Sequence, residues 1–525
     1  MRVLISDNLS ELGVKILRES GEIEVDVKVG LSPEELKQII GQYHGLAIRG
    51  ATKVTADIIA SADNLKVIGR AGAGLDNVDI PAASKRGIVV MNTPGGNTVT
   101  TAEHAISMMM ALVRNIPQAN ASMKAGKWEK KKFSGTEICN KTLGVIGLGK
   151  IGSVVADRAR GLGMNVAAYD PYLSPEQAKQ IGVKLCSLDE VFKESDIITL
   201  HVPLTDETRG LISAKNIAKM RDGVRIINCS RGPVVNEDEL ADAIESGKVA
   251  GAALDVFVQE PPGESRLVGL DRVICTPHLG AATQEAQDNV AIAVADQIRD
   301  YLINGTIRNA VNAPAVSGEA LITLKPFLDL SQRLGSFLGQ LTQTGIKNVE
   351  AQYSGEVSSM ALSPITTSFL TGLLTPLMKE EVNQVNAPMV AKERGIVVSE
   401  TKVSKGEAFT SLLRYKLTTE RDAYVVEGTL FGNESRMCRY GPYRGEFDLS
   451  GNMLLIDALD KPGIIGKVGS YLAERGVNIS HLQFARQEQG GAALLFLNTD
   501  SRPDDKTVKA LKVLDHVLSV SRIAI

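Results

Sequence analysis

The sequence predicts an α/β protein whose central part is a doubly wound parallel sheet, and three observations support that fold class. Strand-like and helix-like segments alternate between residues 142 and 255, which is the rhythm of βαβ units. A glycine-rich turn joins the first of these strands to its helix. The chain of 525 residues is too long for one hydrophobic core and corresponds to about three or four domains.

The composition favours a cytoplasmic metabolic protein. Charged residues make up 23% of the chain and nearly cancel to a formal net charge of -3, so the basic field that attracts nucleic acids or anionic membranes is missing. The longest apolar stretch, residues 105–113, is far shorter than the roughly 20 residues that span a bilayer. Five scattered cysteines without a CxxC pair argue against a disulfide framework and a zinc site. We expect no metal, no nucleic acid partner and no membrane contact.

Residues 142–170 contain a dinucleotide-binding pattern. A short apolar strand leads into Gly147-x-Gly149-x-x-Gly152, and a helix-period segment and a second strand follow. Gly147 permits the tight turn, and Gly149 lets the backbone approach a pyrophosphate. Gly152 lets the helix pack closely on the strand. Because strand, turn and helix occur in the right order, the segment predicts a dinucleotide site.

Neighbouring groups indicate which dinucleotide binds. The amides of Lys150 and Ile151 open a helix N-terminus, which favours anionic oxygens. Asp170 ends the second strand and suits a ribose diol, and its carboxylate would repel a 2′-phosphate. No arginine directly follows it in DPYLSPEQ, so the sequence favours NAD over NADP.

A second glycine-rich turn, in residues 65–80, does not complete the same pattern. Gly72-x-Gly74-x-x-Asn77 lacks the third glycine, and the next strand ends without an acid for a ribose. The turn instead places Arg70 beside flexible backbone. Either this arginine binds an anionic substrate or it is an ordinary surface arginine on a turn.

The alternation continues beyond residue 170 as expected of a doubly wound sheet. The expected helices are residues 188–194, 214–220 and 237–245, and the expected strands are residues 196–202, 224–229 and 251–255. Ligands bind outside the carboxyl ends of the strands in such sheets, so the residues after each strand are candidates for chemistry. Three ionisable residues stand there: Arg231, Glu260 and His278.

Together these side chains suit hydride transfer between a nicotinamide cofactor and a 2-hydroxy or 2-keto acid. Arg231 can hold the carboxylate with a bidentate fork and polarise the keto oxygen. His278 can exchange a proton with that oxygen as the hydride moves. Glu260 can accept the other ring N–H, fix the tautomer and stabilise the cation. A lone loop histidine more often caps a helix or faces water, so the catalytic interpretation depends on these partners.

At these residues the chain resembles the D-2-hydroxyacid dehydrogenase family. The matching motifs are RAGAGLDNVDI, NTPGGNT, VIGLGKIG, HVPLT, NCSRGPVVNE, LDVF with EPP, and TPHLGAAT, in order over roughly residues 40 to 285. The resemblance implies Arg231, Glu260 and His278 as the catalytic set. It also implies NAD contacts at Gly147, Gly149, Lys150, Ile151, Gly152, Asp170, Val202, Cys229, Ser230, Asp255, Gly280 and Ala281. Pro233 departs from the usual RGG, and Gly96 stands at a variable position.

The family architecture interleaves two lobes. By resemblance, residues 1–95 and 285–310 form a flavodoxin-like substrate-binding domain, and residues 96–284 form the Rossmann-type NAD domain inserted in it. Arg49, Arg70 and Asn97 would then face the cleft between the lobes, and the two arginines would clamp a substrate phosphate. The alternative is that these arginines form salt bridges across the lobes.

The last 200 residues resemble the regulatory part of long members of this family. The segment NAPAVSGEA after Val311 is interpreted as a linker. Residues 318–445 resemble an α+β intervening domain. Residues 452–525 have the order βαββαβ and resemble an ACT domain, a module that binds small amino acids. By resemblance, Asp460 and Asn478 would bind L-serine, although Asp460 could instead cap the following helix.

The resemblance implies NAD-dependent oxidation of 3-phosphoglycerate, the first committed step of serine biosynthesis, by a homotetramer that L-serine inhibits. Two alternatives remain open. One is a related reductase for glyoxylate or hydroxypyruvate. The other is a non-enzymatic NAD-sensing protein on the same fold, similar to the transcriptional corepressors of the family.

Overall fold

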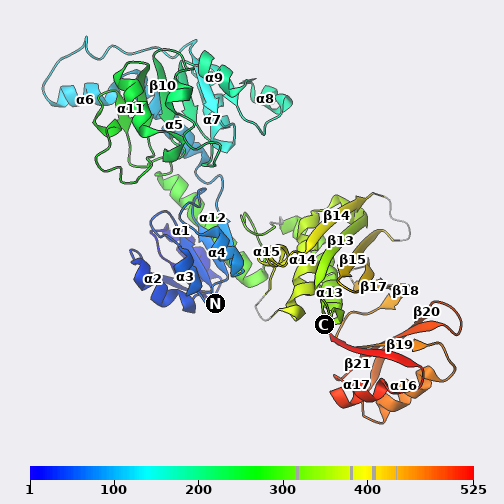
Figure 1. The fold of residues 1–525 in the computed structure, drawn as a ribbon. Helices are drawn as coiled ribbons and strands as arrows, with labels where there is room; N and C mark the ends of the chain where they lie inside the picture. Colours follow the sequence, from blue (N-terminus) through cyan, green and yellow to red (C-terminus); the bar gives the residue numbers. More distant parts are fainter. Residues whose placement is uncertain (315–317, 379–381, 405–408, 433) are drawn as a thin grey trace.

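The computed structural model describes residues 1–314, 318–378, 382–404, 409–432 and 434–525. Within these residues the chain forms four β-sheets of five, seven, six and four strands, in chain order (Figure 1). The predicted fold class is confirmed: two parallel α/β lobes are followed by an α+β domain and a βαββαβ domain. Residues 315–317 of the predicted linker lie outside the described residues.

The first sheet has the order β2-β1-β3-β4-β5, which is the flavodoxin-like order. Its strands are β1 (Arg2–Ile5), β2 (Glu24–Val27), β3 (Gly45–Ile48), β4 (Val67–Arg70) and β5 (Val89–Asn92), and its helices are α1 (Glu11–Glu19), α2 (Pro33–Ile39), α3 (Ala56–Ala60) and α4 (Ile80–Lys85). The long helix α12 (Gln284–Asn304) returns from the second lobe and packs on this sheet. A Cβ on Gly69 would lie 2.6 Å from Val294 and Ile298, so β4 needs glycine for that close approach.

The second sheet is parallel and has the order β12-β11-β10-β9-β6-β7-β8, the doubly wound arrangement of a Rossmann fold. Its strands are β6 (Thr142–Ile146), β7 (Asn165–Tyr169), β8 (Lys184–Leu185), β9 (Ile197–Leu200), β10 (Val224–Asn228), β11 (Val249–Leu254) and β12 (Val273–Cys275). Its helices are α5 (Thr98–Val113), α6 (Ile116–Lys124), α7 (Lys150–Gly161), α8 (Pro175–Ile181), α9 (Leu188–Glu194), α10 (Ala214–Ile217) and α11 (Glu237–Glu245). The six expected elements are present, although the strand at 196–202 and the helix at 214–220 are shorter than predicted.

The third sheet is mixed and the fourth is antiparallel. The third contains β13 (Ile346–Gly355), β14 (Val397–Val403), β15 (Ser411–Thr419), β16 (Ala423–Phe431), β17 (Glu434–Tyr440) and β18 (Tyr443–Phe447), with helices α13 (Gly318–Leu341), α14 (Leu362–Leu374) and α15 (Ala387–Glu393). The fourth domain runs β19 (Asn452–Leu459), α16 (Ile464–Ala473), β20 (Ile479–Arg486), β21 (Ala492–Thr499), α17 (Asp505–Leu511) and β22 (Val517–Ala524). Its βαββαβ order was predicted from the sequence and is confirmed.

The last two domains share one apolar core. The ring of Phe496 on β21 lies 5.2 Å from that of Phe447 and 6.3 Å from that of Phe337, measured between ring centroids. The side chain of Gln340 also exchanges two hydrogen bonds with the backbone of Ala524. Because the core is continuous, the fourth domain cannot be removed without exposing apolar surface of the third.

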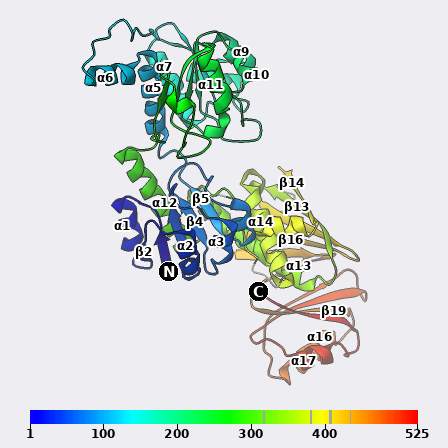
Figure 2. The same ribbon diagram turned by 60° about the vertical axis from the view of Figure 1, so that its left-hand side comes forward.

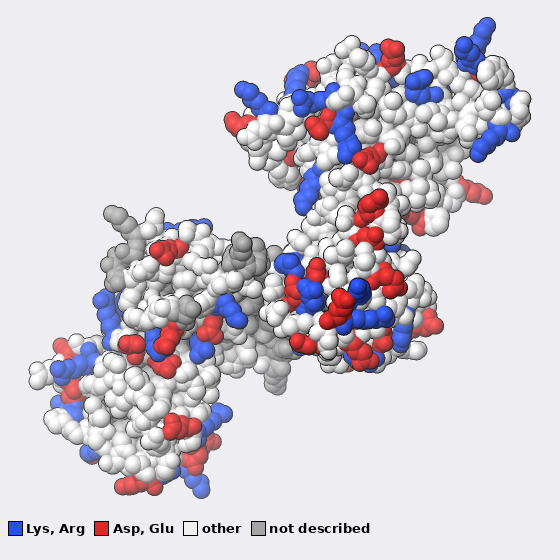
Figure 3. Space-filling model, turned by 180° about the vertical axis from the view of Figure 1, so that it is seen from behind, with Lys and Arg blue, Asp and Glu red and all other residues white. Residues whose placement is uncertain are grey.

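The four sheets are arranged as an elongated molecule. The Rossmann lobe and the fourth domain lie at opposite ends, with the flavodoxin-like lobe and the third domain between them, as both ribbon views show (Figures 1 and 2). Acidic and basic side chains are interspersed over the face drawn in Figure 3. No helix among the described residues is both long and apolar enough to cross a membrane.

Candidate active site

The glycine turn after β6 has the geometry that its predicted roles require. Gly147 has a φ of +94°, which a residue with a Cβ rarely adopts. A Cβ on Gly152 would lie 1.9 Å from the carbonyl oxygen of Gly147, so only glycine lets α7 start this close to the strand. A Cβ on Gly149 would meet no described atom within 4 Å, so this position faces open space. The turn therefore offers room for a pyrophosphate beside the N-terminus of α7.

Asp170 is anchored beside this turn. Its two carboxylate oxygens accept hydrogen bonds from the backbone N–H groups of Leu148 at 2.8 Å and Tyr172 at 2.9 Å. The side chain of Lys150 points to the other lobe, where its Nζ donates to the carbonyl of Pro94 at 3.0 Å. Val202 follows β9 and borders the turn, because a Cβ on Gly147 would lie 3.0 Å from its Cγ1. An acid, an amine and a helix N-terminus thus surround the predicted dinucleotide site.

His278 and Glu260 form a hydrogen-bonded pair at the carboxyl edge of the same sheet. The His278 Nδ1 lies 2.7 Å from the Glu260 Oε2, and the side chains are 52% and 40% exposed. The other Glu260 oxygen accepts the backbone N–H of Phe257 at 3.1 Å, which orients the carboxylate. Since Nδ1 is engaged by the carboxylate, Nε2 is the ring atom that can exchange a proton with a substrate.

A buried carboxylate holds the loop that carries His278. The two carboxylate oxygens of Asp255 accept hydrogen bonds from the backbone N–H groups of Leu279 at 2.7 Å and Gly280 at 2.8 Å. The backbone carbonyl of Asp255 accepts a third hydrogen bond, from the backbone N–H of His278 at 3.0 Å. Burial opposes the ionisation of Asp255, but hydrogen bonds from His104, Thr276 and Leu279 outweigh it and lower the pKa of Asp255 below its ordinary value. The structure therefore gives Asp255 a role in holding the loop, and its predicted contact with NAD stays a prediction.

Arg231 reaches across to the flavodoxin-like lobe. Its Nε donates to the Asp76 carboxylate at 2.9 Å, and one terminal nitrogen donates to the carbonyl of Ser230 at 2.8 Å. Ser230 itself is buried and bonds to the Asn228 side chain. Pro233 lies at the start of a 3-10 helix (Gly232–Val234), a position that tolerates proline, so the departure from RGG does not displace Arg231.

The predicted substrate arginines lie opposite Arg231. The Arg70 guanidinium packs against Gly72, where a Cβ would lie 2.1 Å from it. Its Nε is buried and has no hydrogen-bond partner among the described residues. Burial first, and then the charges of Arg231 and Arg49, lower the pKa of Arg70, while the carboxylates of Asp76 and Asp7 act in the opposite direction. The positive charges of Arg49, Arg70 and Arg231 thus repel one another. An anion bound among these three arginines would relieve that repulsion.

Arg49 and Asn97 complete the residues predicted for this cleft. Arg49 follows β3, its backbone N–H donates to Asp7 at 2.6 Å, and its guanidinium donates to the carbonyl of Asn8 at 3.1 Å. Asn97 stands at the N-cap of α5 but makes no side-chain cap bond among the described residues. Among the described residues, Arg231 forms a salt bridge across the lobes with Asp76, whereas no salt bridge of Arg49 or Arg70 is found there.

The predicted effector residues have separate partners in the fourth domain. The Asp460 carboxylate accepts from Arg486 at 2.8 Å and from the Gly490 N–H at 3.0 Å, and these bonds lower its pKa, the backbone bond most. Helix α16 is instead preceded by Gly463, so the helix-cap alternative for Asp460 is wrong. Asn478 donates to the Asp500 carboxylate at 2.7 Å.

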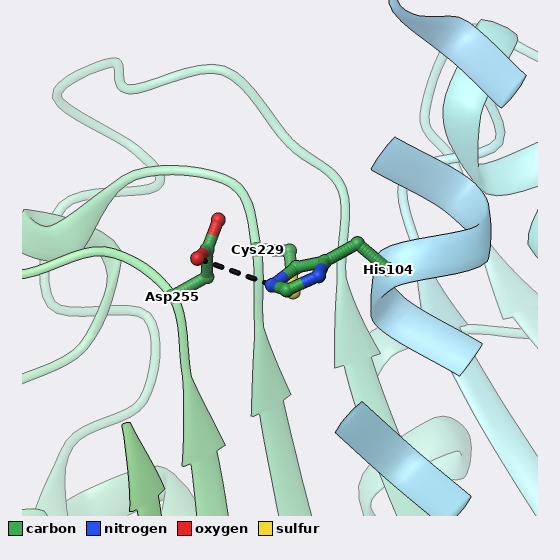
Figure 4. A group of neighbouring side chains, drawn as sticks. All are labelled: His104, Cys229 and Asp255. Atoms are coloured by element: carbon green, nitrogen blue, oxygen red, sulfur yellow. Dashed lines mark hydrogen bonds and ion pairs between the residues drawn. The ribbon is translucent and has the colours of Figure 1, made fainter. Parts of the chain in front are cut away.

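Sequence reasoning named Cys229 and Asp255 as NAD contacts but missed His104, which groups with them behind the His278 loop. His104, Cys229 and Asp255 place their nitrogen, sulfur and oxygen atoms within 4.8 Å of one another (Figure 4). Such atoms could surround a metal ion, but the Asp255 oxygens are already occupied by loop donors, and burial raises the pKa of the Cys229 thiol. We therefore interpret the group as a hydrogen-bonded network. The one sequence signal for it was a histidine at the edge of the apolar stretch 105–113.

Comparison with known proteins agrees with this geometry. Residues 106–280 match the family model of the D-isomer specific 2-hydroxyacid dehydrogenase NAD binding domain. Residues 323–439 match the D-3-phosphoglycerate dehydrogenase intervening domain, and residues 452–516 match the ACT domain. Among solved structures, D-lactate dehydrogenase from Aquifex aeolicus, complexed with NAD and lactic acid, is 28% identical. It covers 60% of this chain and all of its own, with a TM-score of 0.54.

Full-length relatives extend the match over the whole chain. D-3-phosphoglycerate dehydrogenase from Synechocystis sp. is 46% identical over 98% of this chain and 93% of its own length. The enzyme of the same name from Archaeoglobus fulgidus is 43% identical over 100% of both chains. The chain therefore belongs to the D-isomer specific 2-hydroxyacid dehydrogenases, in the branch of phosphoglycerate dehydrogenases that carry an intervening and an ACT domain.

Proposed function

We propose that the chain oxidises 3-phospho-D-glycerate to 3-phosphohydroxypyruvate with NAD, the first committed step of L-serine biosynthesis. The observation that carries the proposal is that the His278–Glu260 couple and Arg231 follow strands at one edge of the same sheet, while the charge of Arg231 acts on Arg70 of the other lobe. His278 can transfer the proton, and Arg231 can bind the substrate carboxylate. Arg70 and Arg49 can bind the phosphate. The full-length relatives named above support the same activity.

Each residue of the site has one role in this oxidation. Arg231 holds the substrate carboxylate, and Arg70 with Arg49 holds the phosphate. The Nε2 of His278 takes the proton of the C2 hydroxyl, and Glu260 stabilises the resulting imidazolium through Nδ1. Bound NAD supplies the hydride acceptor. The residues present fit that cofactor, because an open glycine turn, a helix N-terminus and the anchored Asp170 lie together.

The direct test follows NADH formation from 3-phosphoglycerate by the purified full-length chain. Turnover with this substrate and much slower reduction of glyoxylate and unphosphorylated hydroxypyruvate would support the proposal. Faster turnover of the unphosphorylated acids would favour the reductase, the activity of a similar structure from Paecilomyes thermophila that covers 59% of this chain. NADH binding without turnover of any acid would favour an NAD-sensing protein.

We predict that Asp170→Ala relaxes the preference for NAD. The anchored carboxylate would accept hydrogen bonds from the ribose diol and repel a 2′-phosphate. Losing a hydrogen bond to a charged group costs about 1.5–3 kcal/mol, so the ratio of NAD to NADP efficiency should fall by about 10- to 100-fold. Steady-state rates with both cofactors measure the ratio. Glu176→Ala on α8 is the matched control, and an unchanged ratio in Asp170→Ala would place the ribose elsewhere.

We further propose that L-serine binds the ACT domain and inhibits the enzyme. Asp460 would accept its ammonium, while Asn478 and the N-terminal amides of α16 would donate to its carboxylate. Asp460 is oriented for this by Arg486 and Gly490, which keep it ionised. By resemblance to the family, the effector would bridge two subunits of a cytoplasmic homotetramer.

We predict that Asn478→Ala weakens inhibition by serine about tenfold and leaves the uninhibited rate nearly unchanged, because one hydrogen bond to a charged group is lost. Serine titrations of NADH formation measure both quantities, with the exposed Lys509→Ala as control. Full-length variants are required, since Phe496 belongs to the core shared with the third domain. Equal serine sensitivity in Asn478→Ala and the parent would place the effector site elsewhere.

A further inference from the structure

His104 on α5 reaches the underside of the loop that carries His278. Its Nε2 lies 3.1 Å from the Asp255 Oδ1 (Figure 4). The same nitrogen lies 3.2 Å from the Thr276 hydroxyl oxygen. The Thr276 hydroxyl donates its own hydrogen to the same Oδ1 at 2.6 Å. Asp255 is ionised and can only accept, so the hydrogen between it and His104 must be carried by Nε2. His104 is therefore a donor to the buried carboxylate.

The Asp255 carboxylate holds a loop segment, residues 278–280, whose backbone is strained. His278 has a φ of +54°, a left-handed conformation that residues other than glycine rarely adopt. The next two backbone N–H groups, of Leu279 and Gly280, both point at the Asp255 carboxylate. Helix α5 also holds this loop directly, because the Thr101 hydroxyl donates a hydrogen bond to the Gly280 carbonyl at 2.8 Å. The conformation of the loop thus depends on where Asp255 is held.

We propose that His104 is a positioning residue for His278, acting through Asp255. By donating to the Oδ1, it fixes the carboxylate that holds residues 278–280, and this presents the His278 ring to Glu260 and to the substrate. The inference rests on the proposed function, because it assigns His104 a part in that same reaction.

The other neighbours cannot replace this donor. Cys229 lies in the same group, but burial and the Asp255 charge raise the pKa of its thiol, so it stays a weak S–H donor. The Thr276 hydroxyl already donates to the Oδ1 and has no second hydrogen. Removing the imidazole would leave the buried Oδ1 with one donor fewer.

Two substitutions separate this role from a merely structural one. His104→Leu fills similar space without a donor, whereas His104→Gln keeps an N–H donor at similar reach. We expect His104→Leu to lower kcat about tenfold, with the KM for 3-phosphoglycerate within about twofold of the parent. We expect His104→Gln to recover kcat to within about threefold. Equal kcat in His104→Leu and an active parent, or equal losses in both variants, would overturn the proposal.

A second measurement does not depend on turnover. Hydrogen exchange of the amides of Leu279 and Gly280 should quicken in His104→Leu and stay near the parent rate in His104→Gln. Unchanged exchange in His104→Leu would overturn the inference even if the parent had another activity. Lack of NADH formation from 3-phosphoglycerate by the parent, with the expected exchange difference, would instead contradict the proposed function alone.

Discussion

Replacing His278 with alanine is expected to lower kcat by about 10²- to 10⁴-fold, the usual contribution of a general acid–base group. The physical reason is that the ring is held by Glu260 at 2.7 Å and leaves Nε2 for the substrate hydroxyl. Binding of NAD should change little, because the glycine turn precedes α7 and Asp170 follows β7, whereas His278 follows β12 at the far side of the sheet. Steady-state kinetics give kcat, and calorimetric titration with NADH gives the cofactor affinity.

The control for this experiment is His481→Ala, which removes an exposed histidine from the ACT domain. Glu260→Gln should lose less activity than His278→Ala, because an amide can still accept the Nδ1 hydrogen but carries no charge. Nearly parental turnover in His278→Ala would exclude this histidine as the proton acceptor.

Replacing Arg231 with alanine is expected to lower kcat/KM by about 10²- to 10⁴-fold. Two hydrogen bonds to the substrate carboxylate would be lost, each worth about 1.5–3 kcal/mol when one partner is charged. The link to Asp76 across the lobes would be lost as well. The loss should exceed that of Arg231→Lys, which keeps the charge but not the planar fork.

The matched control is Arg266→Ala, an exposed arginine of the same lobe that pairs with Asp242 and Glu245. It should leave kcat/KM nearly unchanged. If Arg231→Ala retained parental kcat/KM, the carboxylate would have to bind elsewhere, and Arg70 would be the next candidate.

Local patterns were enough to predict the cofactor turn and the strand-end residues. The spacing Gly147-x-Gly149-x-x-Gly152 reflects steric contacts within a few residues, so it is visible in the sequence. Arg231 and His278 were predicted because parallel strands present their carboxyl ends at one edge. The order βαββαβ of residues 452–525 likewise follows from alternating periodicity.

Contacts between residues far apart in the chain could not be predicted from local sequence patterns. The Asp460 carboxylate lies 26 residues from Arg486 in the chain, and the sequence left open whether it caps α16. The structure shows that it binds the β20–β21 hairpin instead. Likewise, residues 318–445 and 452–525 were predicted as two domains from their resemblance to family modules, and only the structure shows that Phe496 joins their cores.

By itself the sequence predicted the Rossmann sheet, the glycine turn and the set of Arg231, Glu260 and His278, because each depends on short-range sterics or on a general rule of parallel sheets. The second α/β lobe was predicted only from the resemblance to the family. Only the tertiary structure decided that Asp76 meets Arg231 and that His104 meets Asp255. These partners are 155 and 151 residues apart in the chain. Their contact depends on how one lobe and one helix pack against the sheet, which no local pattern encodes.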